Sequence, residues 1–137
     1  MTAKQMLALY LITLAVFFLI DMIWLGAVAK GFYRRHLGSM LSPKVNWAAA
    51  ILFYLLFIVG LLVFVIKPAL VSGEPLRALL FGALLGLISY ATYDLSNLAT
   101  LKDWPIIVTV VDLIWGSVLG GAVSFVSVLI SRRFLKL

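Results

Sequence analysis

The sequence predicts an all-α fold, a four-transmembrane-helix integral membrane bundle. Of its 137 residues, 65% are hydrophobic and only 12% are charged, and the mean hydropathy is +1.20. A soluble domain is about half apolar and about a quarter charged. The apolar residues gather in four runs, each long enough to cross the hydrocarbon core as a helix. These runs leave no room for a separate soluble catalytic domain, so we expect one membrane domain over residues 1–137.

Each run is bounded by residues that interrupt or cap helices. The four predicted spans cover about residues 6–28, 45–66, 76–98 and 105–130. Gly73 and Pro75 separate the second span from the third. Pro105 suits the first turn of the fourth helix, where the missing N–H costs nothing. The longest connection, residues 30–44, mixes bulky and basic side chains and is open to three interpretations: a solvated loop, an interfacial helix or a lid over a ligand.

The chain contains no cysteine and a single histidine, His36. This composition excludes disulfides, zinc–thiolate sites, iron–sulfur clusters and bis-histidine haem. Carboxylate and tyrosine oxygens would suit only a hard cation, and no calcium-loop spacing occurs. We therefore expect no cofactor and no metal site.

Basic residues dominate outside the spans. Outside the spans the chain has eleven Lys and Arg residues but only two acids, Glu74 and Asp103. This positive charge predicts contact with membrane lipid head groups and no nucleic-acid partner. Arg34, Arg35 and Lys102 are the expected head-group contacts. Six basic residues lie on the side of the termini and five on the opposite side, a count that narrowly favours cytoplasmic termini.

Three aspartates, Asp21, Asp94 and Asp112, lie inside the predicted spans. An aspartate near the centre of a membrane helix costs on the order of 3 kcal/mol on insertion scales. Because successive spans run in opposite directions, all three aspartates fall in the leaflet of the first and third connections. They predict a buried hydrogen-bonding network, a site for a proton or cation, or a site for a lipid head group.

Helical spacing groups other residues with these acids. Tyr90, Tyr93, Asp94 and Asn97 share one face of the third span, because they are three, four and seven residues apart. That face continues toward the small residues Gly82, Gly86 and Ser89. It therefore predicts close helix packing at one end and a polar aromatic patch at the other.

The first and fourth spans each carry an aspartate followed three residues later by a tryptophan. Asp21 precedes Trp24 and Asp112 precedes Trp115, so each pair shares a helix face at similar depth. An inverted internal repeat is one interpretation. We expect both tryptophans to take part in the site, through stacking or cation–π contact. Gly116 continues the face of the fourth span and suits close packing.

One stretch of the third span resembles a known family. The segment from Ala91 to Thr100, followed by Lys102 to Pro105, resembles the signature of an uncharacterised domain-of-unknown-function family of small bacterial predicted membrane proteins. The segments beginning at Asp21 and Asp112 resemble the same family. The resemblance implies four helices and a multi-pass protein of the bacterial inner membrane, and it implies no activity.

Together these features favour a non-enzymatic protein that binds a small amphipathic or cationic ligand, such as a lipid, in one leaflet. The expected ligand-binding residues are Asp21, Trp24, Tyr90, Tyr93, Asp94, Asn97, Asp112 and Trp115. One alternative is a proton-coupled transporter acting as a homo-oligomer, since small multidrug exporters share this architecture. Another is a structural or accessory subunit of a larger membrane complex. A lipid-modifying enzyme is less favoured, because no nucleophile arrangement or cofactor fingerprint occurs.

Overall fold

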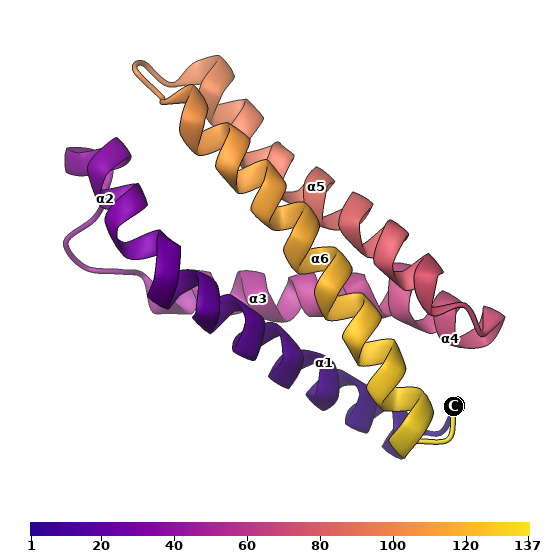
Figure 1. Cartoon of the computed structure of the whole chain (residues 1–137). Helices are drawn as coiled ribbons and strands as arrows, with labels where there is room; N and C mark the ends of the chain where they lie inside the picture. Colours follow the sequence, from indigo (N-terminus) through magenta and orange to yellow (C-terminus); the bar gives the residue numbers. More distant parts are fainter.

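The structure, a computed structural model describing residues 1–137, is helical throughout and contains no strand (Figure 1). Four helical segments are long and apolar enough to cross a membrane: Ala3–Met40, Trp47–Ser72, Pro75–Thr100 and Ile106–Phe134. The predicted all-α fold with four membrane-spanning helices is therefore confirmed.

The first segment comprises helix α1 (Ala3–Trp24), a π-helical turn (Leu25–Ala29), helix α2 (Lys30–Leu37) and a short 3-10 turn (Gly38–Met40). At its start, the Thr2 hydroxyl accepts from the Gln5 backbone N–H at 3.1 Å, and the Gln5 side chain accepts from the Thr2 N–H at 2.9 Å. This reciprocal capping satisfies two backbone donors. The helix continues past the end of the predicted span, so the first half of the predicted connection is helical.

The second segment contains a break of the same type. Helix α3 (Trp47–Leu61) passes through a π-helical turn (Leu62–Ile66) into helix α4 (Lys67–Ser72). The Asn46 side chain caps α3 by accepting from the Ala49 N–H at 3.1 Å. Gly73 ends α4 with a φ of 73°, a left-handed conformation that favours glycine.

Helices α5 (Pro75–Thr100) and α6 (Ile106–Phe134) run side by side as a hairpin and form the most extensive interface in the molecule (Figure 1). Glycines allow this approach. A Cβ atom on Gly86 would collide with the backbone carbonyl of Gly116, and one on Gly120 would collide with the carbonyl of Gly82. The predicted close packing of these small-residue faces is confirmed.

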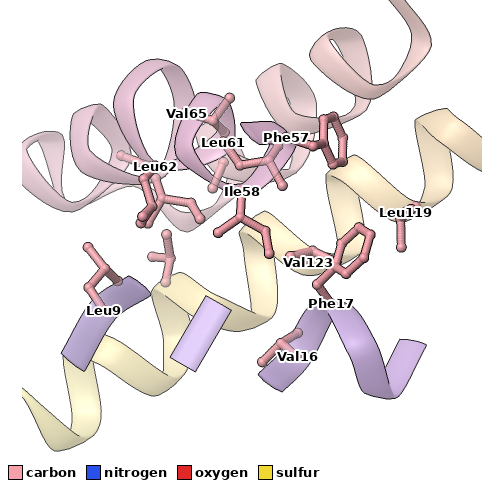
Figure 2. Packing of buried hydrophobic residues seen from close by; sticks show 14 residues of the cluster. Leu9, Val16, Phe17, Phe57, Ile58, Leu61, Leu62, Val65, Leu119 and Val123 are labelled. Carbon is pink, nitrogen blue, oxygen red and sulfur yellow. The ribbon is translucent and has the colours of Figure 1, made fainter. Parts of the chain in front are cut away.

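A single large hydrophobic cluster joins α1, α3 and α6 (Figure 2). Phe17 of α1, Ile58 of α3 and Leu119 of α6 are completely buried within it. The outward faces of the helices carry large apolar side chains instead, as at Phe64, which is 70% exposed. An apolar exterior around a packed interior suits a lipid environment.

Candidate functional site

A cavity of about 660 Å³ lies between α3, α5 and α6, toward the first and third connections. Its lining residues come from the first half of α3, the second half of α5 and the first half of α6: Ala49, Ala50, Phe53, Tyr54, Ser89, Tyr90, Tyr93, Asp94 and Asp112. Two of the three intramembrane aspartates and both predicted tyrosines therefore share one cavity.

Asp94 is the most unusual residue of this cavity. Its side chain is completely buried, and neither carboxylate oxygen has a hydrogen-bond partner. Its backbone carbonyl accepts from the Thr109 hydroxyl at 3.4 Å, which ties α5 to α6 beside the cavity. Buried polar atoms without partners are rare in proteins and costly. The two oxygens of Asp94 are therefore buried polar atoms of the cavity wall whose hydrogen-bonding capacity is unused.

Asp112 faces the same cavity from α6 and is 6% exposed. One of its carboxylate oxygens accepts a hydrogen bond from the Tyr33 hydroxyl of α2. Sequence reasoning missed Tyr33 as a site residue. The available signal was the spacing of four between Ala29, Tyr33 and Leu37, which continues one helix face beyond the apolar run.

Trp24 and Trp115 lie against each other beside the cavity instead of lining it. Their rings stack with centroids 4.4 Å apart and planes 7° apart. The stack joins the end of α1 to α6 and brings the two Asp–Trp segments together. Asp21, one turn before Trp24, is buried at 4% exposure and is not among the residues that line the cavity.

The other predicted residues lie outside the cavity. Asn97 is half-buried one turn beyond Asp94 on α5, and the predicted head-group contacts Arg34, Arg35 and Lys102 are exposed. The cavity that contains Asp94 and Asp112 is lined by no Lys or Arg. No group of three or more His, Cys, Asp or Glu side chains is arranged to hold a metal ion.

The aromatic walls include residues that the sequence did not single out. Phe53 and Tyr54 of α3 line the cavity, and the Tyr54 ring lies 5.2 Å from the Phe17 ring of α1. The rings of Tyr93 and Trp104 pack edge to face, with their centroids 5.8 Å apart. The Trp104 indole N–H donates to the Thr109 hydroxyl at 3.0 Å. These contacts anchor one tyrosine wall to the start of α6.

A known protein family matches nearly the whole bundle. A family of predicted membrane proteins, DUF2177, matches residues 6–129. The match reaches from the first turns of α1 into the last turns of α6 and confirms the resemblance found in the sequence. No curated protein and no solved structure matches the chain.

Proposed function

The chain belongs to the DUF2177 family of predicted membrane proteins, and we propose that it binds a cationic amphiphile in the cavity between α3, α5 and α6. The observation that carries this proposal is the Asp94 carboxylate, which is buried in the cavity wall without a hydrogen-bond partner. A positively charged ligand would satisfy both of its oxygens.

Charge supports a cationic ligand over an anionic one. Asp94 and Asp112 line one cavity, and no Lys or Arg lines it with them. Two carboxylates in a low-dielectric site repel each other unless a proton or a cation accompanies them. An ammonium group between them would relieve that repulsion and would leave the hydrogen bond from Tyr33 to Asp112 intact.

The remaining lining suits the apolar part of such a ligand. Ala49, Ala50 and Phe53 give α3 an apolar wall, and Tyr54, Tyr90 and Tyr93 supply aromatic rings. Aromatic faces attract quaternary ammonium groups. The volume of about 660 Å³ lies within the range of small-molecule sites.

Native mass spectrometry of the protein in lipid nanodiscs tests this proposal. The probe is dodecyltrimethylammonium, compared with an uncharged dodecyl ether of the same chain length. We expect a one-to-one adduct with the cationic probe only. Asp94→Asn and Asp112→Asn should each weaken that adduct at least tenfold, because each removes a carboxylate from the cavity.

Asp103→Asn is the matched control. Asp103 lies exposed in the connection between α5 and α6 with a φ of 59°, a conformation that asparagine accepts readily. This variant should retain the adduct at the wild-type level. Equal retention of the probe by wild type, Asp94→Asn and Asp112→Asn would contradict the proposed function.

A further inference from the structure

A second groove lies at the opposite end of the bundle, where α4 turns into α5. Its volume is about 470 Å³, and its walls come from the π-helical turn Leu62–Ile66, from α4 and from the first turn of α5. The lining residues are Val63, Lys67, Pro68, Val71, Ser72 and Arg77. The groove shares no residue with the aspartate cavity.

The charge of this groove is entirely positive. Lys67 contributes an ammonium group from α4 and Arg77 a guanidinium group from α5, and no acidic residue lines the groove. Arg132 of α6 adds a third basic group nearby, since its guanidinium donates to the carbonyl of Gly73 at 3.4 Å. Basic residues from three helices thus surround the short turn between α4 and α5, and the acid of that turn, Glu74, lines the neighbouring groove with Arg77.

The position of the groove suits the boundary between lipid tails and head groups. The turn at Gly73 joins α4 to α5, and Lys67 lies about 9 Å before that turn along the helix at ~1.5 Å per residue. A lysine at this depth can extend its stem toward the interface. The Arg77 guanidinium lies over the Phe81 ring, 5.4 Å from its centroid, so Arg77 stands between this groove and a neighbouring one that Phe81 lines.

Apart from Ser72, the rest of the groove is apolar, and it is open to the surroundings of the bundle. Val63 is 52% exposed and Val71 is 87% exposed. In a membrane these side chains face acyl chains, so the groove presents two positive charges directly beside a lipid-facing surface. Basic pockets of this type between membrane helices recognise anionic lipid head groups.

We propose that this groove binds an anionic phospholipid, with its phosphate between Lys67 and Arg77 and an acyl chain along Val63 and Val71. The site lies in the leaflet opposite the aspartate cavity and takes a ligand of opposite charge. It does not depend on the function proposed for that cavity.

Native mass spectrometry from micelles that contain phosphatidylglycerol or phosphatidylcholine tests the proposal. Wild type should retain phosphatidylglycerol in preference to phosphatidylcholine. In the double variant Lys67→Gln and Arg77→Gln, we expect association with phosphatidylglycerol to weaken about thirtyfold, from the effect of two basic residues at an anionic lipid surface. The variant Lys67→Arg with Arg77→Lys exchanges the two residue types and keeps both positive charges. It should preserve retention of phosphatidylglycerol and so show that substitutions at these positions leave the protein folded.

The matched control removes two lysines from the other side of the membrane. Lys30 at the start of α2 and Lys44 in the connection after α2 are both exposed. The variant Lys30→Gln with Lys44→Gln has the same net charge as the groove variant. It should retain phosphatidylglycerol at the wild-type level. Equal losses in the two double variants, or equal retention of both lipids by wild type, would overturn the proposal. Strong competition by inorganic phosphate would overturn it as well, because the lipid would then not be the occupant.

Discussion

The Tyr33 hydroxyl of α2 donates a hydrogen bond to the carboxylate of Asp112 in α6, although the two residues are 79 positions apart in the chain. This contact joins the extension of the first span to the wall of the aspartate cavity. Phe32 and Tyr33 also pack near buried Trp104 and Val108, which places α2 against the start of α6. The segment after the π-helical turn is therefore a structural part of the site.

Tyr33→Phe should destabilise the protein by about 1.5 to 3 kcal/mol, because it removes the hydrogen-bond donor to a buried carboxylate. Thermal unfolding in micelles measures the effect. Tyr93→Phe is the control, since the Tyr93 side chain is 59% exposed and its hydroxyl makes no contact with a buried carboxylate of the kind that Tyr33 makes. Equal stability of the two variants would show that the Tyr33 contact contributes nothing.

Gly86→Ala should disrupt the α5–α6 interface, because the added methyl group would collide with the carbonyl of Gly116. We expect a loss of about 1 to 3 kcal/mol, typical of overpacking. Gly31→Ala is the matched control: a Cβ atom there meets nothing within 4 Å, and alanine favours the helix. The two free energies of unfolding should change in opposite directions, and a shift of the same sign and size in both would refute the close-packing account.

Trp24→Leu should cost about 0.5 to 1.5 kcal/mol beyond the loss of buried area, because it abolishes the stack with Trp115. Trp47 at the start of α3 is 63% exposed, so Trp47→Leu should have little effect on unfolding. The near-ultraviolet circular dichroism of stacked indoles gives a second readout. An unchanged spectrum in Trp24→Leu would be incompatible with the stack.

Binding of the cationic probe should weaken as the pH falls. Protons compete with the ammonium group for the carboxylates of Asp94 and Asp112, so acidic buffer should reduce the adduct and mildly alkaline buffer should restore it. The uncharged dodecyl ether serves as the comparison. Cation binding that strengthens in acid would contradict this competition. The other titratable groups that interact with the two carboxylates are Tyr33, Tyr90 and Tyr93, and Tyr54 lines the same cavity.

The strongest sequence signals came from simple constraints. Apolar run length was sufficient to predict four spans. Antiparallel succession placed Asp94 and Asp112 in one leaflet, and the structure brings both to one cavity. Glycine spacing predicted a small-residue face suited to close packing on the third span and another on the fourth, and the structure packs these two faces against each other at Gly86 and Gly116.

Other features had weaker signals. Ala49 to Tyr54 belong to an apolar run without a polar residue to distinguish one helix face, so α3 could not be assigned to the cavity. The helix through Leu25–Ala29 continues into a polar, basic segment, where composition indicated a connection. The mutual stacking of Trp24 and Trp115 depends on the packing of α1 against α6, which spacing along one helix cannot supply.

Photoaffinity labelling tests the central claim most directly. The probe is a dodecyltrimethylammonium analogue with a diazirine in its chain, applied to wild type, Asp94→Asn and Asp103→Asn in nanodiscs. The account predicts labels within residues 49–54 and 89–94 that excess dodecyltrimethylammonium suppresses and that Asp94→Asn abolishes. Labels spread over lipid-facing side chains such as Leu19 and Phe64, unchanged by competition or by Asp94→Asn, would contradict it.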